Sequence, residues 1–478
     1  MRSSRRRSWR LQAALILLVL LLDALLAADA RVLPGLRALN EIPQGAASAG
    51  AGPRISVALA ILGHSKTLSG TRLLHSRNGQ VKTGLDVLAE RGALFASKAG
   101  ENLPGGEPRL RPATCASRPC RVGLVTNQTG VDSRGRRGID LLAKLRDVEL
   151  RAIFSPEHGI NGALDTTHIA EARDRATGVR VYSVYGSSDA ARRPPPEVLK
   201  QLDAVVFDIQ DAGVRWYTYE TTLGYFLEAC AAAKLPLIVL DRPNPITGAV
   251  VQGAVSDAGH ESFVNYHPLP IRHAMTMGEL AWLFNSERKI GAALSVIRMQ
   301  GWQRGDWFDA TGLPWINPSP ALRSLDAAAL YPGVALVEMT NVSVGRGTET
   351  PFEVLGAPWI DRRRLAAYLN ARELSGVHWL PVSFTPASGP YARQLCHGVH
   401  ILLTARDQLE SPELGLEIAS ALLKLYPRQF QPKRIAALLA NSASFQALMR
   451  GDDPRRIADG WRERLEQFAH IREKYLLY

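Results

Sequence analysis

The amino-acid sequence predicts an α/β protein, in which an open, doubly wound parallel sheet is followed by a smaller α+β domain. From Arg121 onward, short apolar runs bounded by turn residues alternate with segments of helical periodicity, a pattern typical of a parallel sheet flanked by helices. Several runs are apolar throughout, as expected for strands covered on both faces. The chain has 478 residues, about twice the size at which one hydrophobic core stops growing, so two domains are expected.

The first domain is expected to span residues 81–290. Its strand candidates are short apolar runs at Val122–Thr126, Leu150–Phe154, Val179–Val184, Ala204–Phe207 and Leu237–Leu240. Apolar residues repeat at helical spacing between these runs, which predicts helices at Gly138–Arg146, Pro194–Gln201 and Thr221–Lys234.

The second half of the chain has a more mixed pattern. It contains an expected helix at Met277–Asn285, an expected strand at Leu294–Met299, and loops rich in Pro and Gly from Gly312 to Pro320. We expect the domain boundary between Asn285 and Trp302, with a smaller α+β domain over residues 291–478. A cleft between the domains is the expected place for a ligand.

Residues 1–30 have the features of a secretory signal peptide. Five Arg precede an apolar run from Leu11 to Leu22, and Ala28-Asp29-Ala30 forms a small-x-small cleavage site. An uncleaved anchor is the alternative, but Asp23 would then lie inside the span, where a charge is costly. We therefore expect an exported protein, periplasmic or extracellular, without stable membrane insertion after cleavage. Residues 31–80 form a low-complexity leader with no assigned function.

The charge balance does not indicate a nucleic-acid partner. The whole chain has a formal net charge of +12, of which +3 lies in residues 1–30, leaving +9 on the rest. That charge is spread along the chain, without runs of Lys or Arg interleaved with aromatic residues. We therefore expect no nucleic-acid binding.

The four cysteines exclude a scaffold built from disulfides, and no Cys-x-x-Cys pair suggests a structural metal. Cys115 and Cys120 lie in a weakly structured segment, Ser97–Pro119, where they can close a small disulfide ring in an oxidising compartment. Cys230 and Cys396 have apolar surroundings and are expected to be buried thiols.

Polar residues follow four of the strand candidates, where a doubly wound sheet binds its ligand. They belong to TNQTG (126–130), SPEHG (155–159), DIQDAG (208–213) and DRPNP (241–245). Each one alone has a structural explanation, because Asp and Asn favour turns and helix caps. Their convergence at one edge predicts a binding site.

Glu157 is the strongest catalytic candidate. It lies between Pro156 and His158 after a buried strand, where partial desolvation would raise the pKa of its carboxyl group, as a general acid requires. A helix cap is the structural alternative. Arg346 has glycines on both sides, which let the backbone approach a ligand while the guanidinium binds a carboxylate. No Gly-x-Ser-x-Gly or Gly-x-Gly-x-x-Gly motif supports a serine nucleophile or a dinucleotide cofactor.

Eight motifs together resemble the NamZ family of exo-β-N-acetylmuramidases, formerly a domain of unknown function. In chain order they are GLVTNQTG (123–130), FSPEHG (154–159), VFDIQDAGVRWYTY (206–219), LDRPNP (240–245), PIRHAMTMGELA (270–281), GLPWINPSP (312–320), NVSVGRGTETPFE (341–353) and EKYLLY (473–478). The resemblance extends from about Val81 to the C-terminus. It implies a Rossmann-like domain joined to a smaller one, and hydrolysis of terminal N-acetylmuramic acid from the non-reducing ends of peptidoglycan fragments, with no metal or cofactor.

The resemblance places the family's SPEHG glutamate on Glu157 and its neighbouring histidine on His158. Two features depart from the family pattern: the segment Ser97–Pro119 precedes the first strand, and Leu164-Asp165-Thr166-Thr167-His168 replaces an Asp-Ala-Gly stretch. These departures affect the expectation about how the substrate is bound more than the expectation about which reaction is catalysed.

Glycoside hydrolysis needs an acid on the leaving oxygen and a second group that acts at the anomeric centre. The expected catalytic residues are Glu157 as the acid, His158 and Asp208. Asp208, Asp211 and Glu349 remain open as the second group, as does a substrate-assisted route in which Asp208 orients the 2-acetamido group. Arg215 and Arg346 are the expected partners of the lactyl carboxylate of muramic acid. The expected substrate-binding residues are Asn127, Asp211, Arg215, Tyr217, Asn244, His273, Asn317, Arg346 and Glu349.

Two other functions remain open from the sequence. One is a wall-binding protein that retains sugars without cutting them. The other is a metal-dependent phosphohydrolase built on Asp208 and Asp211, although no His lies at ligand spacing from them in the sequence.

Overall fold

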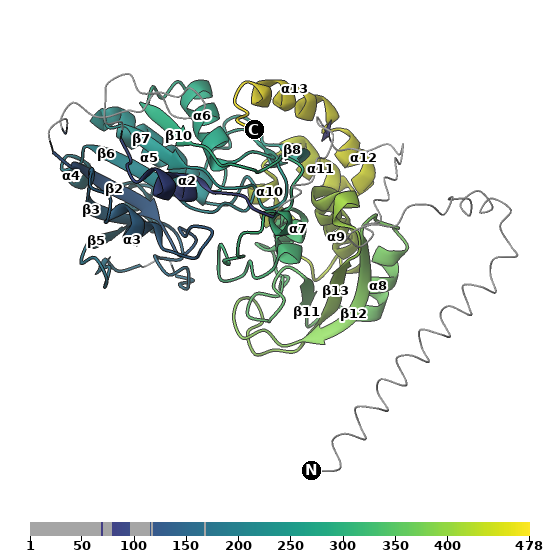
Figure 1. Cartoon of the computed structure of the whole chain (residues 1–478). Helices are drawn as coiled ribbons and strands as arrows, with labels where there is room; N and C mark the ends of the chain where they lie inside the picture. Colours follow the sequence, from purple (N-terminus) through teal and green to yellow (C-terminus); the bar gives the residue numbers. More distant parts are fainter. Residues whose placement is uncertain (1–67, 70–78, 96–114, 116–117, 167–168) are drawn as a thin grey trace, which may run out of the picture. The chain divides into compact units, whose positions relative to one another are not determined.

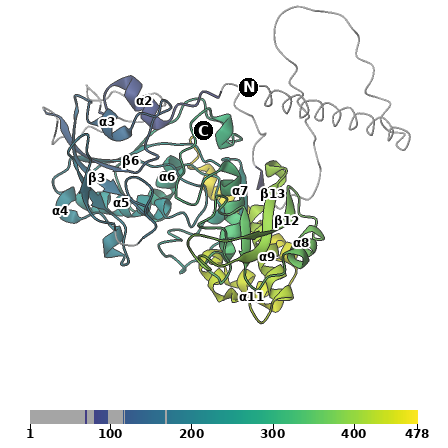
Figure 2. The same ribbon diagram turned by 90° about the horizontal axis from the view of Figure 1, so that it is seen from below.

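The computed structural model describes residues 68–69, 79–95, 115, 118–166 and 169–478 (Figures 1 and 2). These residues belong to one compact unit, which runs from His64 to Tyr478. The expected signal peptide and most of the leader and of the segment 97–119 lie outside the described residues. Within the described part, no helix is long and apolar enough to cross a membrane.

A seven-stranded sheet organises the first half of the chain, with the strand order β10-β7-β6-β2-β3-β5-β4. Every neighbouring pair is parallel except β4 with β5. The strands are β2 (Cys120–Thr126), β3 (Val148–Ser155), β4 (Ala172–Arg173), β5 (Arg180–Ser183), β6 (Ala204–Asp208), β7 (Leu237–Leu240) and β10 (Leu294–Ile297). The five predicted strands and the doubly wound parallel fold are confirmed.

Two apolar cores cover the two faces of this sheet. Along β6, Val206 packs into a core with residues of α2 (Gly84–Arg91) and α3 (Gly138–Leu142). Its neighbours Val205 and Phe207 point to the other face and pack with residues of α5 (Tyr219–Ala233). Coverage on both faces explains why these strands are apolar throughout. It also leaves the strand ends as the part of the sheet where polar loops collect.

The predicted helices are present with adjusted bounds. The helix α4 spans Pro196–Leu199, and α6 spans Met277–Glu287, where Thr276 and Glu279 form a capping box. The helix α3 ends at Leu142 instead of Arg146, because the amides of Lys144 and Leu145 bond to carbonyls three residues back, in a tightened turn.

The expected strand Leu294–Met299 belongs to the large sheet of the first domain and not to the smaller second domain. Its residues form β10, which pairs in parallel with β7 and becomes an edge of the large sheet. All four β10 residues are buried, as the covered faces of that sheet require. A small antiparallel sheet of β1 (Leu68–Ser69), β8 (Val250–Val255) and β9 (Pro270–Arg272) accompanies it.

The second half of the chain has the expected α+β character. Its antiparallel sheet has the order β11-β13-β12, with β11 at Val354–Ala357, β12 at Val377–Phe384 and β13 at Cys396–Leu403. The helices α7 (Leu325–Val334) and α9 (Ser411–Leu425) approach closely at Gly333 and Gly415, where an added Cβ would meet backbone atoms within 2.4 Å. The remaining helices are α8 (Arg362–Asn370), α10 (Ile435–Leu439), α11 (Ser442–Arg450), α12 (Pro454–Asp459) and α13 (Arg462–Glu473).

The C-terminus returns to the large sheet. The Tyr478 hydroxyl donates a hydrogen bond to the Asp241 carboxylate at 2.8 Å and accepts one from the Met299 amide at 2.8 Å. Asp241 follows β7 and also accepts hydrogen bonds from Thr276 and Gly278 at the start of α6. Tyr478 therefore completes a hydrogen-bond network at the carboxyl end of β7.

The four cysteines fall into the two expected classes. Cys115 and Cys120 form a disulfide. Cys230 and Cys396 are buried free thiols.

Candidate active site

The candidate site lies at the carboxyl edge of the large sheet, next to β2. The chain passes from β2 to β3 on one side, while β6 pairs with β2 on the other. Such a switch point opens a crevice beyond the strand ends. The loops after β2, β3, β5 and β6 meet there, and they carry most of the polar residues that the sequence singled out.

Glu157 is held by two hydroxyl groups in this crevice. Its Oε1 accepts a hydrogen bond from Tyr185 at 2.6 Å, and its Oε2 accepts one from Thr218 at 2.5 Å. Burial and the neighbouring Glu157 carboxylate raise the pKa of Tyr185, so this hydroxyl keeps its proton and acts as the donor. The Glu157 side chain is half-buried. The two hydroxyls therefore fix the orientation of its carboxyl group, and the residue remains partly exposed to solvent.

His158 holds the loop that follows Glu157. Its ring Nδ1 lies 2.8 Å from the Leu164 carbonyl, and the Leu164 amide donates to the His158 carbonyl at 3.1 Å. His158 and Gly159 both have positive φ angles, of 71° and 75°. This backbone conformation is costly for a residue with a side chain, so the ring contact helps to stabilise the turn. The contacts of His158 thus indicate that it positions a loop, in contrast to the expected direct part in catalysis.

Asp208 lies beneath the crevice and is fully buried. Its Oδ1 accepts a hydrogen bond at 2.6 Å from Nε of Arg242, which follows β7. Burial raises the pKa of Asp208 and the Arg242 charge opposes this rise. The pair joins the ends of β6 and β7. Because none of its side chain is exposed, Asp208 is not placed to orient a substrate group as expected.

A second buried cluster consists of Asp211, Glu220 and His273. The His273 Nε2 lies 2.8 Å from Glu220 Oε1 and 3.8 Å from Asp211 Oδ2. Burial, followed by the Glu220 charge, raises the pKa of Asp211 to about 7, and burial lowers the pKa of His273 to about 4. The imidazole is therefore neutral at pH 7.

The spacing of this cluster would suit a metal ion, since one ligand atom from each residue lies within 4.8 Å of the others. The imidazole argues against that use. Its Nδ1 accepts a hydrogen bond from the Met275 amide at 3.1 Å, so in the neutral ring the proton is on Nε2, the atom that faces both carboxylates. A protonated Nε2 donates to a carboxylate and cannot ligate a metal.

The other buried residues of the expected binding set have partners within the protein. Arg215 donates to four backbone carbonyls, those of Ala254, Leu269, Leu438 and Leu439, so its guanidinium is not placed to receive a lactyl carboxylate. Asn127 binds Thr129, Asn244 binds Met275 and Ile246, and the Tyr217 ring packs edge-on against Tyr219 and Tyr331. These residues therefore support the site from the protein interior.

Three expected binding residues remain accessible. Arg346 is about a quarter exposed; its Nε pairs with Glu338, and its guanidinium lies 5.4 Å from the centre of the Phe352 ring. Asn317 is exposed and accepts a hydrogen bond from Trp315. Glu349 is 97% exposed and lies 3.3 Å from Arg323.

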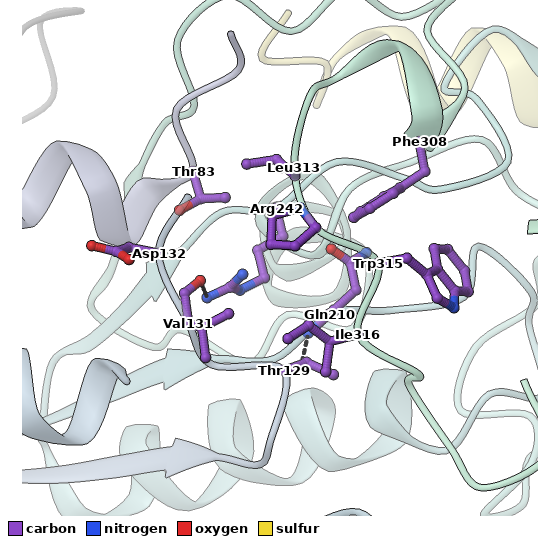
Figure 3. A pocket seen from close by; sticks show the side chains of 11 residues that line it. Thr83, Thr129, Val131, Asp132, Gln210, Arg242, Phe308, Leu313, Trp315 and Ile316 are labelled. Atoms are coloured by element: carbon purple, nitrogen blue, oxygen red, sulfur yellow. Dashed lines mark hydrogen bonds between the residues drawn. The ribbon is translucent and has the colours of Figure 1, made fainter. Parts of the chain in front are cut away.

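A neighbouring part of the sheet edge is filled by protein. Side chains from the loops after β2, β6 and β7 face the segment between β10 and α7, and Figure 3 shows Thr129, Gln210 and Arg242 converging with Leu313, Trp315 and Ile316. The cavity between them has a volume of about 20 Å³, enough for one water molecule. This cavity is therefore too small to hold a sugar.

Neither of the two residues that hold Glu157 is among those expected from the sequence. Thr218 stands inside the motif VFDIQDAGVRWYTY, and Tyr185 directly follows the expected strand Val179–Val184. Tyr185 could have been found from the sequence, because residues that directly follow a strand of a doubly wound sheet are candidates for its ligand site.

Comparison with known proteins connects this geometry to a family. Models of the N-terminal and C-terminal domains of the exo-beta-N-acetylmuramidase NamZ match residues 122–326 and 329–478. The chain belongs to the NamZ family. The peptidoglycan beta-N-acetylmuramidase NamZ of Bacillus subtilis (strain 168) is 38% identical over 408 residues, which cover 83% of this chain and 98% of the relative. The chain is thus a member of a glycoside hydrolase family.

Two solved structures share the fold of this NamZ family member. Both are crystal structures of DUF1343 family proteins from Bacteroides fragilis NCTC 9343. One is 31% identical with a TM-score of 0.73, and the other is 28% identical with a TM-score of 0.62; each match covers 84% of this chain and 99% of the other.

We expect Asp211 to make stability depend on pH. Its pKa is about 7 in the folded protein and about 3.9 in an unfolded chain. Its stabilising contribution is therefore complete below pH 4 and is lost as the pH rises through 7. In urea unfolding between pH 5 and 8, the parent should lose stability relative to Asp211→Asn, by up to about 1.4 kcal/mol per pH unit. Parallel pH profiles for the two proteins would contradict this, and the exposed Asp452→Asn serves as the control.

Proposed function

We propose that the protein is an exo-acting glycoside hydrolase that releases N-acetylmuramic acid from the non-reducing ends of peptidoglycan fragments. Family membership supports the reaction class. The observation that carries the proposal is Glu157, a half-buried carboxyl group fixed by two hydroxyls at the carboxyl edge of the sheet. The signal peptide expected from the sequence supports action outside the cytoplasm, in cell-wall turnover.

Glu157 is the proposed acid, which protonates the leaving glycosidic oxygen. Tyr185 and Thr218 hold its two oxygens, so the carboxyl group meets the scissile bond in one orientation. Restricting a catalytic group in this way contributes to rate because less orientational freedom is lost in the transition state.

Arg346 is the proposed partner of the lactyl carboxylate, the group that distinguishes muramic acid from glucosamine. Its Nε is bound to Glu338, and this contact holds the guanidinium plane in place. The structure gives its two terminal nitrogens no hydrogen-bond partner among the described residues, so they present a fork to a carboxylate.

The two alternative functions have less support. A metal-dependent phosphohydrolase built on Asp208 and Asp211 is disfavoured, because Asp208 is paired with Arg242 and the His273 nitrogen that faces Asp211 is protonated. A sugar-binding protein without activity would not require a carboxyl group oriented by two hydroxyls.

The purified protein should release free N-acetylmuramic acid from a short glycan with a non-reducing muramic acid end, and should leave glycans with a glucosamine end intact. Chromatography of the products with mass detection measures both. Internal fragments released from long strands, or equal action on both ends, would show that the exo-muramidase assignment is wrong.

The variant Glu157→Gln should lower kcat by about 10²–10⁴-fold with little change in melting temperature. The amide keeps the shape, and the hydroxyls of Tyr185 and Thr218 can accept hydrogen bonds from it as well as donate to it. Steady-state kinetics on a chromogenic muramide and thermal unfolding test the two parts. Glu171→Gln, an exposed carboxylate paired with Arg180, is the matched control. A loss of stability without a loss of rate would mean that Glu157 is structural.

The variant Arg346→Lys should weaken recognition of the lactyl group. A charge-assisted pair is worth about 1.5–3 kcal/mol, or about tenfold to a hundredfold in affinity, and Lys keeps the charge without the planar fork. Calorimetry should show weaker binding of N-acetylmuramic acid and little change for N-acetylglucosamine. Unchanged binding of both sugars would place the carboxylate elsewhere.

A further inference from the structure

The first half of the chain has a hollow that the proposed function does not yet use. It has a volume of about 250 Å³ and is lined by residues of the segment 189–193, of α5 and of the loop between β8 and β9, together with Arg288. Ligand pockets in proteins begin at about 300 Å³, so this hollow is close to the size that a sugar needs. It is called the Arg192 hollow below.

Aromatic contacts connect the Arg192 hollow to Glu157. Tyr185, which donates to Glu157 at 2.6 Å, has its ring centre 5.9 Å from that of Phe263. Phe263 lines the hollow, and the Arg192 guanidinium lies 4.2 Å from the centre of its ring. The wall of the hollow is therefore only two side-chain contacts away from the Glu157 carboxyl group.

The guanidinium of Arg192 is held in place with its terminal nitrogens open to a ligand. Its Nε donates to the Gly186 carbonyl at 2.8 Å, and this bond together with the aromatic contact fixes the plane of the group. The structure gives its two terminal nitrogens no hydrogen-bond or ion-pair partner among the described residues. Arg193 and Arg288, by contrast, both pair with Glu228. A fixed planar fork of this kind suits a carboxylate.

The carboxylates that line the hollow leave this fork accessible. Asp189 and Glu228 lie 2.9 Å and 2.6 Å from nitrogens of Arg193, which balances part of their charge. Glu261 is exposed at the mouth of the hollow, and within the described part of the chain no ion pair joins it to Arg192. An anionic group of a ligand can therefore pair with Arg192.

A separate series of aromatic contacts leads from Glu157 to Arg346 in the second half of the chain. It begins at the Tyr219 hydroxyl, 3.5 Å from the Glu157 carbonyl, and continues through the rings of Tyr217, Tyr331 and Phe352. Glu157 is thus connected to one accessible guanidinium in each half. Since Arg346 is the proposed partner of the terminal sugar, the Arg192 hollow is left for the glycan beyond the bond that Glu157 protonates.

We propose that the Arg192 hollow is a subsite for the leaving glycan, in which Arg192 pairs with the lactyl carboxylate of the next muramic acid. Muramic acid alternates with glucosamine in peptidoglycan, so every fragment longer than three sugars with a muramic acid end carries this second carboxylate. Another hollow, of about 510 Å³, shares Glu228 and Arg288 with the first and offers space to longer strands. This inference rests on the proposed muramidase function and names the substrates it prefers.

The test compares a disaccharide of N-acetylmuramic acid and N-acetylglucosamine with the tetrasaccharide made of two such units. Arg192→Ala should raise KM for the tetrasaccharide about tenfold, because a charge-assisted pair is lost, and should leave kcat and the disaccharide KM within about twofold. Arg192→Lys should give an intermediate KM. Arg450→Ala, which removes an exposed Arg paired with Asp452, is the matched control. Melting temperatures show that each variant is folded.

Two further substrates identify the source of the carboxylate. For the parent, a tetrasaccharide with glucosamine in place of the second muramic acid should have a KM about tenfold above that of the natural tetrasaccharide. A disaccharide that carries a peptide on its lactyl group should be affected by Arg192→Ala no more than the plain disaccharide. An effect of Arg192→Ala on the peptide-bearing substrate alone would show that the hollow binds peptide, and would overturn the proposal.

The outcomes separate this subsite from the function on which it rests. A parent that releases muramic acid from both glycans, with a tetrasaccharide KM that Arg192→Ala does not change, overturns only the role of the Arg192 hollow. A parent that releases muramic acid from neither glycan overturns the proposed function itself.

Discussion

The candidate site depends on the joint between the two halves of the chain, and Arg215 is the central residue of that joint. Its guanidinium binds two carbonyls from the first half, at Ala254 and Leu269, and two from α10 in the second, at Leu438 and Leu439. Burial lowers its pKa to about 9, so it still carries a charge at neutral pH. The first half supplies Glu157 and the second supplies Arg346. The placement of Glu157 relative to Arg346 therefore depends on contacts between the two halves, including those of Arg215.

The buried polar groups form a supporting layer under the crevice. Asp208 pairs with Arg242, and the carboxyl groups of Asp211 and Glu220 face His273, in each case away from water. Glu220 stands two residues after Thr218, which holds Glu157. A disturbance of the buried cluster would thus reach the Glu157 carboxyl group through the start of α5. The buried acids are in this way linked along the chain to a residue that orients Glu157.

Much of the fold could be predicted from the sequence because the apolar runs directly indicate which strands are buried. The runs at 204–207 and 237–240 have no polar residue, and a sheet covered on both faces is the arrangement that suits them. Glu157 could be found in the same way, from its position after a strand. How deeply each of these polar side chains is buried could not be predicted from the sequence. Asp208 and Glu157 both come at the ends of expected strands, yet Asp208 is buried against Arg242 while Glu157 is partly exposed. The difference arises because loops distant in the sequence decide which strand end is covered.

The hydrogen bonds of Tyr478 connect parts of the protein that are far apart in the sequence. Asp241, which follows β7, takes one of its hydrogen bonds from Tyr478, 237 residues further along the chain. Asp241 is fully buried, so a protein cut short before Tyr478 would leave this carboxylate with one hydrogen bond fewer and no water to replace it. The first sheet is therefore linked to a segment that is synthesised long after its own strands, and a tag fused after Tyr478 would have to leave this site without displacing the tyrosine.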